Sequence, residues 1–343
     1  MQKESESFKS LRNEGFRERT ALSVEDLSVR FYLEAGAVSA VNHLSFEVQR
    51  GTNFGIVGES GSGKTVTALT IMGLLPMPPG RVDSGKIMFD GEDLLKKTPN
   101  QMRDIRGKKI AMIYQDPMTS LNPVLRVGFQ IAESLIVHDK IPKGEAEERA
   151  IKLMGAVGIP DPEKRARAFP HQFSGGMRQR IMIAMALSTD PEILIADEPT
   201  TALDVITQAQ ILALLKSLQK QRNMTVILIT HDLGIVAEFC DEVLVMYAGV
   251  GMEHGTTRQI FATPKHPYTR GLLESITRVD KDIKRLNSIA GEIPNLMRPP
   301  GGCRFHPRCP YAFQQCTVDE PEEFVLPDGR FSKCWLTATE AQE

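Results

Sequence analysis

The stretch Gly58-Glu59-Ser60-Gly61-Ser62-Gly63-Lys64-Thr65 satisfies every fixed position of the pattern G-x-x-x-x-G-K-[ST]. One apolar run precedes it at Phe54–Val57 and another follows at Val66–Met72, which is the strand–loop–helix context that the pattern requires. Small residues let backbone N–H groups turn inward around a polyphosphate, and the helix start adds a partial positive charge. The stretch therefore predicts a phosphate-binding loop rather than an ordinary Gly/Ser loop.

The last two residues of this loop carry specific chemistry. We expect the Lys64 ammonium to reach the β- and γ-phosphates of a nucleotide as a point charge. The Thr65 hydroxyl supplies an oxygen ligand of the kind that Mg²⁺ prefers. The pattern therefore predicts a site for a nucleoside triphosphate with Mg²⁺.

Composition and charge exclude several classes of protein. The chain has 343 residues, of which 41% are hydrophobic, and its net charge is −2. This charge gives no global basic field of the kind that nucleic-acid binders show. The first twenty residues contain no apolar segment typical of a secretory signal, and no run approaches the ~20 apolar residues of a membrane helix. We expect a cytoplasmic protein, soluble or peripheral to a membrane, without a nucleic-acid partner.

Hydrophobic patterning predicts an α/β fold with a parallel-sheet core. Apolar residues alternate over 27–31 and 44–48, which is typical of antiparallel strands, and 116–173 has helical character. Runs 193–196 and 226–229 are continuously apolar, as in strands buried on both faces. We divide the chain into a polar leader (1–20), a nucleotide-binding domain (21–265) with a helical subdomain (about 116–175), and a Cys-rich C-terminal extension (266–343).

Polar residues follow the two continuously apolar runs. Asp197 and Glu198 end the first of them, and Thr230 and His231 end the second. Ligands of open parallel sheets bind beyond the carboxyl ends of the strands. Asp197 is placed to hold Mg²⁺, and Glu198 to polarise the water that attacks the γ-phosphate. Paired acids at a strand end are common on surfaces, but the upstream phosphate loop favours the functional interpretation.

A second candidate for anion binding is Ser174-Gly175-Gly176, which precedes an apolar run at Met177–Leu187. Ser174 suits a helix N-cap, and the two glycines allow a phosphate close to the backbone. Taken alone, these residues fit an ordinary helix cap with a flexible joint better than an anion site.

Taken together, these motifs resemble the ATP-binding-cassette ATPases over roughly residues 22–265. The motifs occur in the order phosphate loop, Gln115, Phe173-Ser174-Gly175-Gly176-Met177, Asp197-Glu198, Thr201-Ala202-Leu203-Asp204 and His231. Phe173 stands where Leu is usual and Met177 where Gln is usual, but the Ser-Gly-Gly core is kept.

The resemblance implies that ATP is hydrolysed between two cassettes stacked head to tail. ATP on the phosphate loop of one subunit would be capped by Ser174, Gly175 and Gly176 of the other, so that phosphate lies between two helix N-termini. The partner would be a second ATPase subunit, in a heterodimer or, for the isolated protein, a homodimer.

The resemblance also gives roles to four further positions. Gln115 would contact Mg²⁺ and the attacking water, His231 would bind the γ-phosphate, and Asp204 would lie at the dimer seam. Phe31 is the expected adenine-stacking aromatic, with Tyr32 as its rival, and a core aromatic is the alternative for both. Residues 116–126 would receive the membrane partners.

The C-terminal part resembles the C-terminal region of oligopeptide/dipeptide importer ATPases, and more particularly their D-type subunit. The matching stretches are Lys265-His266-Pro267-Tyr268-Thr269, Gly291-Glu292-Ile293-Pro294 and Pro299–Cys309. Such ATPases work at the cytoplasmic face of the membrane with two permease subunits and an extracellular substrate-binding protein. The resemblance implies ATP-driven import of dipeptides or oligopeptides; relatives carry nickel chelates or glutathione.

Four cysteines, Cys303, Cys309, Cys316 and Cys334, have the spacing C-x5-C-x6-C-x17-C. The spacing alone is compatible with zinc or iron–sulfur ligation and matches neither common pattern closely. The resemblance implies a [4Fe–4S] cluster of structural role, with zinc and four unligated thiols as alternatives. The fifth cysteine, Cys240, follows Phe239 in an apolar run and is expected in the core.

Two other functions remain as alternatives. A soluble cassette ATPase of DNA repair or translation would share the motifs, although such machines usually carry two cassettes or long insertions. A non-catalytic binding module would lack one of the motifs, and none is missing here.

Overall fold

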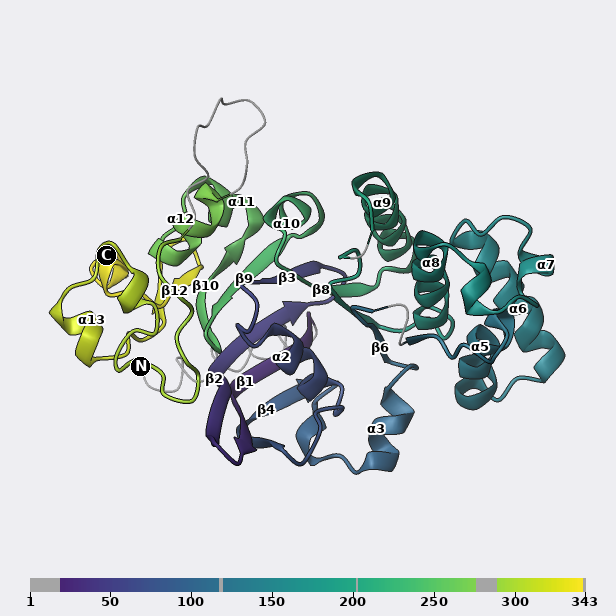
Figure 1. Ribbon diagram of the computed structural model, residues 1–343, viewed down its shortest axis with the longest axis horizontal. Coiled ribbons are helices and arrows are strands. Elements are labelled where there is room, and N and C mark those ends of the chain that lie inside the picture. The colour runs from purple at the N-terminus through teal and green to yellow at the C-terminus, as the bar shows by residue number, and fades with distance from the viewer. Residues whose placement is uncertain (1–18, 117–119, 202, 276–288, 342–343) are drawn as a thin grey trace, which may run out of the picture.

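The computed structural model describes residues 19–116, 120–201, 203–275 and 289–341 (Figure 1). The strands are β1 (Thr20–Leu33), β2 (Gly36–Gln49), β3 (Asn53–Val57), β4 (Gly80–Phe89), β5 (Glu92–Asp93), β6 (Ile110–Ile113), β7 (Ile193–Asp197), β8 (Thr225–Thr230), β9 (Glu242–Tyr247), β10 (Val250–Thr256), β11 (Phe324–Val325) and β12 (Phe331–Ser332). The α-helices are α2 (Lys64–Ile71), α3 (Pro99–Ile105), α5 (Val127–Ser134), α6 (Lys143–Ala156), α7 (Pro162–Arg165), α8 (Gly175–Ala186), α9 (Val205–Arg222), α10 (Leu233–Phe239), α11 (Thr257–Ala262), α12 (Pro267–Glu274) and α13 (Gln314–Val318). Shorter turns are η1 (Leu94–Lys96), the π-helix η2 (Leu135–Asp139), η3 (Pro170–Gln172), η4 (His306–Arg308) and η5 (Trp335–Thr337).

The main sheet has the order β11-β12-β10-β9-β3-β8-β7-β6. Strands β6, β7, β8, β3 and β9 pair in parallel, with Val57 beside Thr230 and Asp197 beside Ile229. Every residue of β3, β7 and β8 is buried. This confirms the prediction that the continuous apolar runs are central strands covered on both faces.

A second, antiparallel sheet has the order β2-β1-β4-β5. Its apolar residues, among them Leu22 and Val29, form one core with Phe54 of β3 and Ile71 of α2. Figure 1 shows α2 beside β1, β2 and β4. The alternation seen in the sequence is therefore the inward face of this sheet, which packs on the phosphate-loop helix.

Helices α5, α6, α7 and α8 gather at the β6 end of the main sheet (Figure 1). Their apolar faces, including Ile131, Ala150 and Ile181, belong to the same core as Leu194 of β7 and Leu228 of β8. Helices occupy most of residues 127–165, within the stretch 116–173 for which the sequence predicted helical character. The predicted membrane-facing surface at 116–126 lies partly outside the described residues, and the leader at 1–20 almost wholly so.

The C-terminal segment, residues 289–341, lies at the opposite end of the molecule from α5–α7 (Figure 1). It joins the main sheet through β12, which pairs with β10 at Glu253–Ser332 and His254–Phe331. Sheet hydrogen bonds therefore cross the boundary predicted near residue 265, and the division into domains there stays a prediction. Among the described residues, no helix has the length and apolar character needed to cross a bilayer.

Candidate functional site

The predicted nucleotide-site residues converge at one edge of the main sheet. Strands β6, β7, β8 and β3 are neighbours in that order. Gln115 follows β6, Asp197 ends β7, His231 follows β8 and Gly58 follows β3. Because these strands are parallel, their carboxyl ends meet at the same edge, as the sequence predicted.

The phosphate loop needs glycine at two positions for steric reasons. Gly58 has φ +155° and a Cβ there would lie 2.1 Å from the Met246 carbonyl oxygen. Gly63 has φ +99° and a Cβ would lie 2.4 Å from the Ala40 carbonyl oxygen. Both contacts are with backbone atoms that cannot move aside. No side chain caps α2, which starts after Gly63, so the first N–H groups of the helix remain available to an anion.

Lys64 is buried beneath this loop, with 6% of its surface exposed. Its Nζ donates to the carbonyl oxygens of Gly58 at 2.7 Å and Glu59 at 3.0 Å, and lies 3.4 Å from Ser62 Oγ. Burial lowers the pKa of Lys64, while the carboxylates of Glu198, Asp197 and Glu59 oppose that shift. The Lys64 ammonium is therefore surrounded by oxygen atoms of the phosphate loop.

Thr65 and Asp197 present oxygens to each other. The Thr65 hydroxyl donates to Asp197 Oδ1 at 3.3 Å, and Asp197 is 2% exposed. Burial raises the pKa of Asp197, and the hydrogen bond from Thr65 opposes the rise. A buried carboxylate beside a hydroxyl is a donor set of the kind that Mg²⁺ takes. These two residues therefore fit the Mg²⁺ position that the sequence assigned to them.

Glu198 is the centre of a hydrogen-bond network that joins three strand ends. Its Oε2 accepts from Gln115 Nε2 at 3.1 Å and from the Thr201 hydroxyl at 2.9 Å, and its Oε1 lies 3.0 Å from His231 Nδ1. Burial acts to raise the pKa of Glu198, but the bonds from His231 and Thr201 outweigh it and lower the pKa. Sequence reasoning named all of these residues, but it gave Thr201 only as the start of the motif Thr201–Asp204 and assigned it no role; its position three residues after Glu198 was the available signal.

The backbone at Glu198 is itself unusual. Its φ of +46° lies in the left-handed region, which a glutamate rarely adopts. Its N–H donates to the Ile229 carbonyl oxygen of β8 at 2.8 Å. The turn is thus fixed to the neighbouring strand, and it aims the carboxylate across the strand ends.

The Ser174 loop is exposed, as a surface offered to a second molecule must be. Ser174 is the N-cap of α8 and its hydroxyl accepts from Met177 N at 3.4 Å. Ser174 and Gly175 are exposed. Asp204 caps α9 through Thr207, and the two residues after it, Val205 and Ile206, are 82% and 73% exposed. Both loops therefore combine a structural cap with an uncovered surface.

The two candidates for adenine stacking differ in exposure. Phe31 is partly buried and packs against the antiparallel-sheet core. Tyr32 is 47% exposed, and its hydroxyl lies 3.3 Å from Asp83 while Arg81 lies over its ring. Phe31 thus has one side against the core, and the ring of Tyr32 is the more exposed of the two. Which of them stacks on adenine stays a prediction.

The four C-terminal cysteines line one small cavity together with His266, Phe305 and Trp335. None of them forms a disulfide. Burial raises the pKa of Cys303 to about 11 and that of Cys334 to about 12. Within the described residues, however, no three His, Cys, Asp or Glu side chains are close enough to hold a metal ion. The geometry therefore does not support the metal site that the resemblance implied for these cysteines. Cys240 is buried, as predicted.

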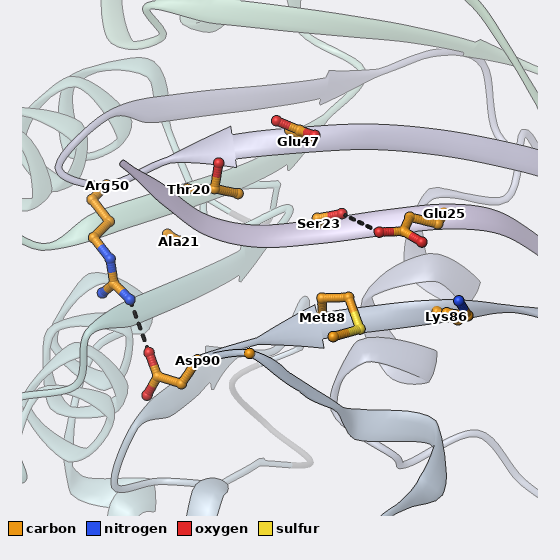
Figure 2. A pocket seen from close by; sticks show the side chains of 10 residues that line it. Thr20, Ala21, Ser23, Glu25, Glu47, Arg50, Lys86, Met88 and Asp90 are labelled. Carbon is orange, nitrogen blue, oxygen red and sulfur yellow. Dashed lines mark hydrogen bonds and ion pairs between the residues drawn. The ribbon is translucent and has the colours of Figure 1, made fainter. Parts of the chain in front are cut away.

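A separate groove lies on the antiparallel sheet (Figure 2). It has a volume of about 510 Å³ and none of the predicted site residues lines it. At one end Arg50 pairs with Asp90 at 2.8 Å and with Glu192 at 3.0 Å. These pairs tie the amino ends of β3 and β7 to the turn after β4, which indicates a structural role.

Comparison with known families finds two matches along the chain. Residues 41–201 match the family model described as "ABC transporter". Residues 252–316 match the model "Oligopeptide/dipeptide transporter, C-terminal region". The two matches fall on the two parts for which the sequence showed a resemblance.

Comparison with individual proteins agrees with these two family matches. The chain is 50% identical over 321 residues to the dipeptide transport ATP-binding protein DppD of Bacillus subtilis, covering 94% of this chain and 96% of that protein. It is also 50% identical over 313 residues to DppD of Escherichia coli, and the match covers 91% of this chain and 95% of that protein. Among solved structures it is similar to the ATP-binding cassette MJ0796, dimeric and bound to ADP and Pi, with a TM-score of 0.62, 27% identity, and coverage of 69% of this chain and 99% of that one.

Proposed function

The chain belongs to the ABC transporter ATP-binding proteins of dipeptide and oligopeptide transport, and from this premise we propose that it hydrolyses ATP between its own phosphate loop and the Ser174 loop of a second cassette. The observation that carries the proposal is the network at the carboxyl ends of β6, β7 and β8. Glu198 there contacts Gln115, Thr201 and His231 within 3.1 Å, and Lys64 lies in the adjoining loop.

The phosphates would bind at the amino end of α2. The Gly58–Thr65 loop supplies backbone N–H groups, and the buried Lys64 supplies the positive charge. Thr65 and Asp197 would hold Mg²⁺ through their oxygens, with Gln115 nearby. Mg²⁺, when bound, neutralises charge on the β- and γ-phosphate oxygens.

Glu198 is placed to act as the general base. Its lowered pKa keeps the carboxylate ionised at neutral pH, so it can accept the proton of the attacking water. Gln115 and Thr201 fix one carboxylate oxygen, and His231 lies at the other. His231 has 57% of its side chain exposed, so its second ring nitrogen is free to turn toward a γ-phosphate.

The second half of the site would come from another cassette. Ser174 and Gly175 are exposed at the amino end of α8, which is a helix start suited to an anion. A phosphate held between α2 of one subunit and α8 of the next lies between two positive helix ends. The exposed residues after Asp204 would lie in the seam between the subunits. ATP bound between the two cassettes then stabilises the closed dimer, in which they are in contact. Hydrolysis shifts the population toward the open dimer, in which they are apart.

The proposed partners are those that the resemblance to importer ATPases implies. We place the protein at the cytoplasmic face of the membrane with a second ATPase subunit, two permease subunits and an extracellular substrate-binding protein. Dipeptides or oligopeptides are the proposed cargo, since the similar proteins are named for their transport. Tyr32 or Phe31 would contact the adenine.

The proposal predicts that transport components control hydrolysis. With the second ATPase subunit and the permeases in lipid nanodiscs, ATP turnover is expected to rise several-fold when peptide-loaded binding protein is added. A Lys64→Ala chain should show no turnover with or without peptide. Turnover indifferent to the permeases, or purification of the chain with nucleic acid instead, would contradict the proposed function.

For the four cysteines we propose a [4Fe–4S] cluster of structural role, with zinc as the alternative. The proposal is supported by the chemistry of the lining, which offers four thiols and no carboxylate to one cavity. Thiolates are the usual ligands of such clusters. The segment around them has few aliphatic residues for its length, and a bound group would stabilise its fold.

This proposal predicts a coloured protein. Anaerobically purified chain should show a broad visible absorption band and about four iron atoms per molecule. Cys309→Ser should remove the band and most of the iron. Cys240→Ala, at the buried cysteine outside the cavity, should keep both. A colourless protein that contains one zinc per chain would contradict the cluster and support zinc. A protein without bound metal would contradict both proposals.

A further inference from the structure

One side chain of the C-terminal segment reaches the phosphate loop. Arg308, in η4, donates from one guanidinium nitrogen to Glu59 Oε2 at 2.7 Å and from the other to Glu59 Oε1 at 3.1 Å. The two residues are 249 positions apart. The Arg308 side chain is 4% exposed, whereas that of Glu59 is 26% exposed. This is a two-point pair of the strong, directional kind, with little solvent around the cation.

Arg308 is held in place by the surrounding backbone. It also donates to the carbonyl oxygens of Ile289 and Ala290, each at 3.1 Å, and lies 3.3 Å from the Tyr247 hydroxyl. Its guanidinium carbon lies 5.7 Å from the centre of the Tyr247 ring. Three polar contacts and the Tyr247 ring fix the guanidinium independently of Glu59, so the pair has little orientational freedom to lose.

Tyr268 makes a second contact with Glu59, through the backbone of the loop. The Glu59 N–H donates to the Tyr268 hydroxyl at 3.0 Å, and Tyr268 is fully buried against Tyr247. The Glu59 carbonyl oxygen in turn accepts from Lys64 Nζ. Backbone and carboxylate of Glu59 are therefore both set by residues C-terminal to the cassette match, and Glu59 sets one contact of Lys64.

The negative charge of Glu59 gives its pair with Arg308 a bearing on nucleotide binding. A carboxylate in a loop that binds a polyphosphate repels its ligand, and the repulsion is strong where water is partly excluded. Arginine stays charged under all ordinary conditions, so Arg308 neutralises the carboxylate permanently. It also turns the carboxylate toward the C-terminal segment.

We propose that Arg308 is a positioning residue for ATP: it neutralises Glu59 and orients the phosphate loop, so the C-terminal segment takes part in nucleotide binding. The inference rests on the proposed function, because it needs ATP on the Gly58–Thr65 loop. It assigns a role in the ATP site to a residue outside the cassette match at 41–201.

The test is the dissociation constant of ATP–Mg²⁺, measured by calorimetry on the full chain. Arg308→Ala should weaken binding by about tenfold, since an unpaired Glu59 carboxylate would then face the phosphates. The double variant Glu59→Gln/Arg308→Ala should recover most of that loss, because it removes the charge that needed neutralising. In turnover assays Arg308→Ala should raise KM for ATP with little change in kcat.

Arg330→Ala is the matched control. Arg330 is another arginine of the C-terminal segment, with 5% of its side chain exposed, and it pairs with Asp328 and donates to the Thr263 carbonyl oxygen. It has no contact with Glu59 among the interactions of the described residues. This variant should perturb the segment without weakening ATP binding.

Three results would overturn the inference. They are wild-type affinity in Arg308→Ala, a double variant no better than Arg308→Ala, and an equal loss in Arg330→Ala. The second separates charge neutralisation from mere support of the fold, because a structural defect would persist in the double variant. A wild-type chain that binds no ATP would instead overturn the proposed function, and this inference with it.

Discussion

Glu198→Gln is expected to lower the rate of ATP hydrolysis by about 100- to 10,000-fold while ATP remains bound. Glutamine keeps the shape of the side chain and its oxygen can still accept from Gln115 and Thr201, but it cannot take a proton from water. Rapid filtration with radiolabelled ATP in the assembled transporter would measure retention, and phosphate release would measure turnover.

The control for this variant lies at the opposite end of β7. Glu192 immediately precedes β7 at its amino end and pairs with Arg50 at 3.0 Å on the surface. Glu192→Gln removes the same charge at the other edge of the sheet, where an exposed pair contributes ~0–1 kcal/mol. It should leave turnover unchanged. Normal hydrolysis in Glu198→Gln would remove Glu198 from the role of base.

The second large effect is expected at Ser174. Ser174→Asp should abolish turnover in the assembled transporter while the chain keeps its thermal stability. Aspartate caps a helix about as well as serine, so α8 should keep its start. Its negative charge, however, would lie where the γ-phosphate of the neighbouring subunit must dock. The effect is best measured with this substitution in both ATPase subunits.

Ser174→Asn separates charge from shape. Asparagine is also a good N-cap and is neutral, so most of the turnover should survive. Each variant should bind ATP at its own phosphate loop with near-normal affinity. Equal activity of the Asp and Asn variants would mean that no phosphate approaches Ser174.

Much of the site could be predicted because local patterns determine it. The phosphate loop is contiguous, and Asp197, Glu198 and His231 each end an apolar run. Parallel pairing then brings them to one edge whatever the loops between them do. The positive φ at Glu198 and its bond to the Ile229 carbonyl could not be foreseen, because they depend on the neighbouring strand.

The parts that escaped prediction depend on long-range packing. Arg308 and Glu59 are each unremarkable in the sequence, and no spacing rule links residues 249 positions apart. Strands β11 and β12 have two residues each, which is too short for any periodicity. Phe31 and Tyr32 are adjacent, so only the direction of each ring relative to the core distinguishes them.

The cysteines illustrate a different limit. They line one cavity, but the metal site expected of them is not supported by the geometry of the described residues. Spacing does not fix the distances between four sulfur atoms, since the loops that carry them are irregular. Chemical analysis of the purified protein decides what they bind.

The most direct test of the whole account is the mass of the Glu198→Gln chain in solution with ATP–Mg²⁺, alone and mixed with the second ATPase subunit of its transporter. Light scattering should show a species of about twice the 38.1 kDa chain mass in at least one of these mixtures, lost on removal of ATP and absent when Ser174→Asp is added to both subunits. A mass that stays at that of one chain with ATP bound, or a dimer indifferent to ATP and to Ser174, would contradict a nucleotide held between two subunits.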